Sequence, residues 1–187
     1  STDKSNTTST KLNSNKNTIA QKRELTEVKD AADSLYEAAG KLTDTSASKS
    51  LFKKADKVTN DITSAVKDYV KNYNSLIEEA ADTTNSKVTG KVSFMTGQAN
   101  AYKSSLEKVG ITINSDKTLS IDEDTFKKSD ISDVKKLFNG SGSMAYQTFV
   151  RASDISSAAE NASTSVTSYG ADGMYNNYYN SAYNWYL

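Results

Sequence analysis

The chain has 187 residues, the size of one domain, and its 23 basic and 23 acidic residues cancel to a net charge of zero at pH 7. A neutral chain has no strong field to attract nucleic acid or an anionic membrane, and no apolar run is long enough for a membrane span, so we expect neither partner. The chain contains no cysteine and no histidine, which removes thiolate metal sites and the commonest general base. We therefore expect no enzyme activity, no cofactor and no metal.

Residues 1–17 are polar and lack hydrophobic periodicity, which predicts a disordered N-terminal tail. Thr18 and Gln21 have the spacing of a capping box, so ordered structure is expected to begin at Thr18. An apolar residue then recurs every three or four positions, which predicts a helix of about 24 residues. Gly40 and the polar run at 43–50 should end it. The stripe consists of Leu25, Val28, Ala32, Leu35, Ala39 and Leu42.

Two further stripes follow, at 51–80 and 88–109. The first predicts a helix of about 30 residues, or ~45 Å, which does not fit inside a small globule and therefore indicates a rod. The second should end at Gly110, because glycine readily adopts the left-handed conformation of a helix C-cap. The members of the two stripes are Leu51, Ala55, Val58, Ile62, Ala65, Tyr69, Tyr73, Leu76 and Ala80, then Val88, Val92, Met95, Ala99, Tyr102, Leu106 and Val109.

The segment 111–121 alternates apolar and polar residues on both sides of the turn NSDK, which predicts a β-hairpin. Two such short strands are not stable alone in water, so their apolar face must pack against helix. Asp122 and Ser132 are expected to cap two short helices after the hairpin. The acidic run 122–124 could attract a hard cation. In an EF-hand register Asn114, Asp116 and Thr118 would occupy the first positions, but the required glycine and bidentate glutamate are absent, so we interpret the run as a strand-to-helix cap.

A last long helix is expected at 144–168, with many alanines on its inner face. The predicted fold is mainly α: an elongated antiparallel helical bundle or coiled coil of three to four long helices with one small β-hairpin. The bundle domain covers 18–168, and a Tyr-rich C-terminal tail covers 169–187.

The C-terminal tail holds the only tryptophan of the chain and tyrosines at helical spacing. Amphipathic rings of this kind are favoured at interfaces. Two interpretations are open: the tail folds back on the bundle, or it contacts a partner or a second copy. We also expect an exposed seam on the second helix. The interface candidates are Tyr69, Tyr73 and Ile77 on that helix and Tyr175, Tyr178, Tyr179, Tyr183, Trp185 and Tyr186 in the tail.

Three segments carry a family resemblance, and they occur in the family's order. VKDYVKNYNSLIEE at 66–79 resembles a helix with a YN-[SE]-L-I core, LEKVGITINSDKTLSIDEDTFKKS at 106–129 resembles a G-I-T hairpin with a T-L-S-[IL]-D-E second strand, and VKKLFNGSG at 134–142 resembles the element that follows. Together they resemble the C-terminal region of the flagellar filament-capping protein family, also called flagellar hook-associated protein 2. Lys117 stands where that family usually has glycine in the hairpin turn.

The resemblance implies a non-enzymatic structural or assembly protein of the bacterial flagellum, similar to the helical core of the filament cap and located outside the cell. Its implied partners are copies of itself or flagellar axial proteins, and its hairpin is implied to be a structural wedge. Two alternatives stay open: a cell-surface adhesion or carbohydrate-binding module that uses the aromatic tail, and a cytoplasmic chaperone for flagellar subunits.

Overall fold

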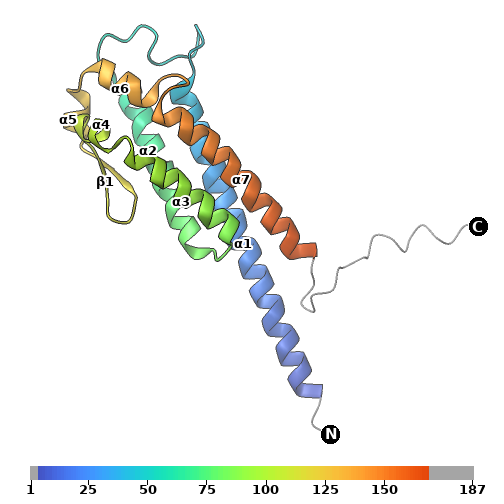
Figure 1. Ribbon diagram of the computed structural model, residues 1–187. Coiled ribbons are helices and arrows are strands. Elements are labelled where there is room, and N and C mark those ends of the chain that lie inside the picture. Colours follow the sequence, from blue (N-terminus) through green and yellow to red (C-terminus); the bar gives the residue numbers. More distant parts are fainter. Residues whose placement is uncertain (1–3, 169–187) are drawn as a thin grey trace, which may run out of the picture.

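The computed structural model describes the backbone of residues 4–168 and the side chains of residues 15–166. This part of the chain forms seven helices and one two-stranded antiparallel sheet, so the fold is mainly helical with a single small hairpin, as predicted (Figure 1). No described helix combines the length and the apolarity that a membrane span requires. The elements are α1 (Lys4–Thr43), α2 (Asn60–Asp82), α3 (Ser86–Asn100), α4 (Lys103–Lys108), β1 (Ile111–Ile113), β2 (Leu119–Ile121), α5 (Glu123–Lys127), α6 (Ile131–Phe138) and α7 (Met144–Ser168).

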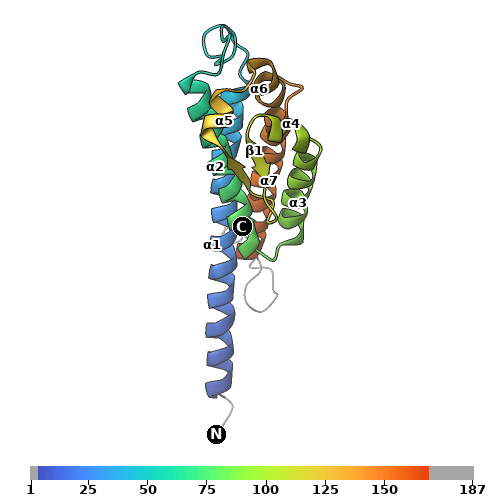
Figure 2. The same ribbon diagram turned by 90° about the vertical axis from the view of Figure 1, so that its left-hand side faces the viewer.

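The first and last helices lie side by side along most of the molecule (Figures 1 and 2). They run in opposite directions: the hydroxyl of Ser156 donates to the Asp33 carboxylate at 2.5 Å, and the rings of Tyr36 and Phe149 stack at 4.1 Å. Gly40 does not end α1. A side chain there would approach the Phe149 ring to 3.2 Å, so glycine allows the two helices to pack closely. The alanines that face this seam are buried: Ala32, Ala39, Ala145, Ala152 and Ala159.

The start of α1 differs from the prediction. The helix begins at Lys4, within the segment expected to be disordered, so Thr18 lies inside the helix and not at its start. Serine, threonine and asparagine cost only tenths of a kcal/mol in a helix, and extending a formed helix does not repeat the cost of nucleating it. Burial begins at Leu25. We call residues 4–24 the α1 extension, because Figures 1 and 2 both show this end projecting past the end of α7.

The second predicted helix starts later than expected. Residues 44–59 are largely irregular, and α2 begins at Asn60, where the Thr59 hydroxyl accepts a hydrogen bond from the backbone N–H of Ile62 at 3.2 Å. The loop is nevertheless anchored: Phe52 is buried in the core and the Lys135 ammonium donates to the Ala55 carbonyl at 2.9 Å. The apolar residues at 51–58 therefore cover the core as a loop, so their spacing was wrongly interpreted as helical.

The third predicted helix is interrupted. Helix α3 ends at Asn100, and α4 resumes at Lys103 after a turn at Ala101 and Tyr102. The Gln147 side chain of α7 donates to the Tyr102 hydroxyl at 2.6 Å, which fixes this turn against α7. Gly110 ends the segment with φ of 77°, which confirms the predicted left-handed cap.

The hairpin has the predicted strands, with Ile111 opposite Ile121 and Ile113 opposite Leu119. Its apolar face packs against α2 and α4, as two isolated strands require. The carboxylate of Asp122 accepts from the Thr125 N–H at 3.0 Å, which confirms the predicted cap of α5.

Helix α6 differs in its cap. Asp130, rather than Ser132, precedes the helix, and its carboxylate accepts from the Ser132 N–H at 2.7 Å. The cap therefore lies two positions earlier than expected. Ser132 is already inside the helix, and the carboxylate of Asp130 is the group that reaches a free N–H of the first turn.

Candidate protein-contact surfaces

Two of the predicted contact residues lie in the core. Tyr69 and Tyr73 are fully buried, and the Tyr69 hydroxyl shares a hydrogen bond with the Thr148 hydroxyl of α7 at 2.8 Å. Burial raises the pKa of both phenols above the ordinary value, so both hydroxyls stay neutral. These two rings are therefore removed from the candidate contact surface, because α2 is covered by other helices on the side that we expected to be exposed.

Ile77, the third candidate on α2, is half-buried. It lines a shallow hollow between α2, α3 and the hairpin turn, together with Ala80, Val92, Asp116 and Lys117. The tail candidates Tyr175, Tyr178, Tyr179, Tyr183, Trp185 and Tyr186 lie outside the described residues.

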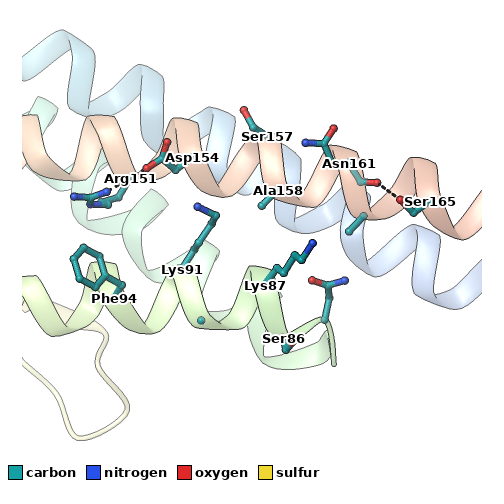
Figure 3. Close-up of a pocket in the computed structure, with 13 residues that line it drawn as sticks. Ser86, Lys87, Lys91, Phe94, Arg151, Asp154, Ser157, Ala158, Asn161 and Ser165 are labelled. Carbon is teal, nitrogen blue, oxygen red and sulfur yellow. Dashed lines mark hydrogen bonds and ion pairs between the residues drawn. The ribbon is translucent and has the colours of Figure 1, made fainter.

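A groove of about 910 Å³ runs between α3 and α7 (Figure 3). The two helices are joined at one end of the groove, where the Arg151 guanidinium donates to the Gln98 side chain at 3.1 Å. Farther along, the facing residues are Gly90, Ala158 and Ala162, whose side chains are too small to fill the space between the helices. The floor of the groove therefore consists of small residues. The groove extends as far as Ser165, close to the end of α7.

Arg151 and Phe94 close the joined end of the groove. The guanidinium lies over the Phe94 ring at 4.7 Å from its centroid, and it also bonds the Asp154 carboxylate at 3.2 Å. Phe94 is nevertheless 55% exposed, which is unusual for a phenylalanine. The ring thus presents an apolar edge to anything that enters the groove.

Two lysines of α3 line the groove, and Figure 3 shows the side chain of Lys91 reaching across it toward α7. Among the residues that the structure describes, neither Lys87 nor Lys91 forms an ion pair. The groove is therefore lined by three cationic side chains, those of Lys87, Lys91 and Arg151, and by one carboxylate, that of Asp154, so its net charge is positive. Such a site is suited to a polypeptide that offers aromatic faces or carboxylates.

A second apolar surface, which the sequence pattern alone does not indicate, lies on the seam of α1 and α7. The Phe149 ring stacks on Tyr36 and on Tyr146, at centroid distances of 4.1 and 6.0 Å. Tyr36, Tyr146 and Val150 are each more than one third exposed. The three-residue spacing of Tyr146 and Phe149 placed them on one side of α7, but only the pairing with α1 brings Tyr36 to them.

Comparison of the chain with protein-family models, with curated proteins and with solved structures finds no match. The family resemblance therefore depends on the three sequence segments at 66–79, 106–129 and 134–142.

Proposed function

We propose that the chain is a non-enzymatic structural or assembly protein of the flagellum, similar to the helical core of the filament cap. In this proposal its long helices act as an elongated antiparallel bundle that binds other helices, either of a second copy or of flagellar axial proteins. The observation that carries the proposal is the α1 extension, a helix that continues beyond the body against which the rest of α1 packs.

A helix of about 20 residues is ~30 Å long, and a helix of this length is only marginally stable by itself in water. Within the described side chains of the extension, Ile19 is 70% exposed. Packing another helix against this segment would cover Ile19 and stabilise the helical conformation. The extension thus has the properties of a contact element that is completed by a partner helix.

The positions of the three resembling segments also support the proposal. The Asn74 side chain of the first segment bonds the backbone of Leu119 in the second at 2.7 and 2.8 Å. Lys67 of the first segment forms an ion pair with Glu123 of the second at 2.7 Å. The ring of Tyr69 in the first segment also meets the ring of Phe138 in the third, edge to face, at a centroid distance of 5.6 Å. The first segment thus contacts both of the others in space, as expected if the three were inherited as one unit.

Self-association is the first test. Sedimentation of the full chain over a range of concentrations should show association, and Ile19→Asp should weaken it, because the substitution places a charge on the exposed face of the extension. Thr112→Asp is the control, since Thr112 is also exposed but lies on β1 of the hairpin, outside the candidate contact surfaces. The same pair should be tested for binding to purified flagellar filaments. A chain that stays monomeric and binds no filament would contradict the proposal.

Location tests the flagellar part separately. Antibody labelling of cells that make the protein, viewed by electron microscopy, should place it at the filament tip or along the shaft. Label spread over the cell surface with bare filaments would instead favour the adhesion alternative.

A further inference from the structure

We propose that residues 174–187 of the C-terminal tail dock as a helix in the groove between α3 and α7 of the same chain. The proposal concerns the groove and the tail only, so it does not depend on a flagellar role.

The place where the tail begins supports docking. Helix α7 ends at Ser168, and Ser165, one turn before, already lines the groove. Gly170 and Gly173 follow directly, and glycine readily provides the backbone conformations that a reversal needs. A chain that reverses at 169–173 re-enters the groove at its open end.

The length of the remaining tail matches the groove. A helix over 174–187 would be about 21 Å long at 1.5 Å per residue. The wall of the groove on α7 extends from Ser165 to Arg151, which at the same rise is also about 21 Å. An extended chain of the same residues would overshoot the groove about twofold, so the helical form is the one that fits.

The chemistry of the two surfaces is complementary. Asp172 is the only charged residue of the tail, which otherwise consists of aromatic, amide and small residues. Aromatic faces attract cations, and the groove offers the ammonium groups of Lys87 and Lys91, which have no ion-pair partner among the described residues. A bound helix would also cover the exposed ring of Phe94.

The groove has room for these rings. Its volume of about 910 Å³ is near the upper end of sites that enclose a drug-sized ligand, about 300–1,000 Å³. The short connection at 169–173 holds the tail at an effective concentration on the order of millimolar. A segment of another protein must displace the tail before it can occupy the same groove.

Trp185 makes the proposal testable in the unmodified protein, because it is the only tryptophan of the chain. Acrylamide quenching of its fluorescence measures how exposed it is to solvent. In the docked state the quenching constant should be several-fold lower than in the urea-unfolded chain. It should also be independent of protein concentration, since the groove belongs to the same chain.

Two glycines of α3 provide a matched pair of variants. A Cβ atom added at Gly90 or at Gly97 would meet nothing within 4 Å, but of the two only Gly90 lines the groove. Gly90→Leu should fill the groove, expel the tail and raise the quenching constant several-fold, whereas Gly97→Leu should leave it at the wild-type value. Lys91→Glu, at an exposed position, is a second variant that should raise quenching without filling space. Circular dichroism verifies that each variant remains folded.

Three results would overturn the proposal. One is a native Trp185 that is quenched as strongly as in the unfolded chain. Another is a Trp185 that is shielded from acrylamide equally well in the wild type, Gly90→Leu and Lys91→Glu, which would place the tail outside the groove. The third is shielding of Trp185 that disappears when the protein is diluted, which would assign the groove to the tail of a second copy.

Discussion

The side chain of Asn74 bonds the backbone of Leu119 in the way that a neighbouring β-strand would. The Leu119 N–H donates to the Asn74 carbonyl oxygen at 2.7 Å, and the Asn74 amide donates to the Leu119 carbonyl at 2.8 Å. One residue of α2 thus satisfies both backbone polar groups of Leu119 at the outer edge of β2. The hairpin is held to the helix by this pair and by its buried apolar face.

Replacing Asn74 by leucine should destabilise the protein by about 1–3 kcal/mol, because two partly buried backbone groups lose their partners. Urea denaturation followed by circular dichroism gives this free energy of unfolding. Asn72→Leu is the control, since among the described residues the Asn72 amide donates to the Asp68 carbonyl of its own helix and to no other group. Equal effects of the two substitutions would mean that the Asn74 bonds contribute no particular stability.

The two buried tyrosines should respond in opposite ways to loss of the hydroxyl. Tyr69→Phe removes the partner of the buried Thr148 hydroxyl and should cost about 1–2 kcal/mol. The buried Tyr73 hydroxyl has no hydrogen-bond partner among the residues that the structure describes. Tyr73→Phe should therefore be neutral or stabilise the protein by up to about 1 kcal/mol. Thermal unfolding of the two variants compares them directly, and a larger loss for Tyr73→Phe would contradict the hydrogen-bond assignment.

Glu123 should make stability depend on pH in the acid range. Its carboxylate accepts from Lys127 and from Lys67, each at 2.7 Å, and these bonds lower its pKa from 4.5 to about 2. Because the pKa is depressed in the folded state, the stabilisation is present above about pH 4.5 and is lost as the pH falls toward 2.

Glu123→Gln should therefore flatten the change in the urea midpoint between about pH 6 and about pH 3. Glu78→Gln, at an exposed residue of α2 without an ion pair among the described residues, should keep the wild-type change. High salt should reduce the wild-type dependence, because both ion pairs are partly exposed. An unaltered pH profile in Glu123→Gln would show that other carboxylates control acid stability.

Lys117 occupies the left-handed region of the hairpin turn, with φ of 73°. This conformation costs a residue with a Cβ atom roughly 1–2 kcal/mol, which glycine avoids. After the greater entropy of glycine in the unfolded chain is subtracted, Lys117→Gly should stabilise the protein by up to about 1 kcal/mol.

Gly110→Ala provides the opposite test. Gly110 has φ of 77°, and an added Cβ would lie 2.8 Å from the Cβ of Thr125. The substitution should destabilise by at least about 1–2 kcal/mol from the backbone alone. Urea unfolding of both variants should therefore give shifts of opposite sign, and a destabilised Lys117→Gly would mean that the lysine side chain itself supports the turn.

Features that depend on local sequence were predicted well. The limits of α7 agree with the prediction of 144–168, the hairpin lies at 111–121, and Gly110 and Asp122 have their expected capping roles. Each of these follows from a period of 3.6 or 2 or from one side chain beside its own backbone.

Features that depend on which surfaces are covered could not be predicted. The apolar residues near Phe52 indicate a segment that is buried, but their spacing fits a loop that folds over the core as well as it fits a helix. The stripe that contains Tyr69 showed that one face of α2 is apolar, without showing how many helices cover it. The groove depends on small residues from α3 and α7, such as Gly90 and Ala158, which lie far apart in the sequence.

The seam of α1 and α7 also determines when this domain can finish folding during synthesis. Ser156 and Asp33 are separated by 123 positions, so α1 leaves the ribosome long before its main packing partner exists. Until α7 has emerged, the side of α1 that α7 later covers, around Ala32 and Ala39, is open to solvent. A nascent chain that stops before Met144 therefore presents this uncovered surface to proteases and to other unfinished chains, and the emergence of α7 is the step that covers it.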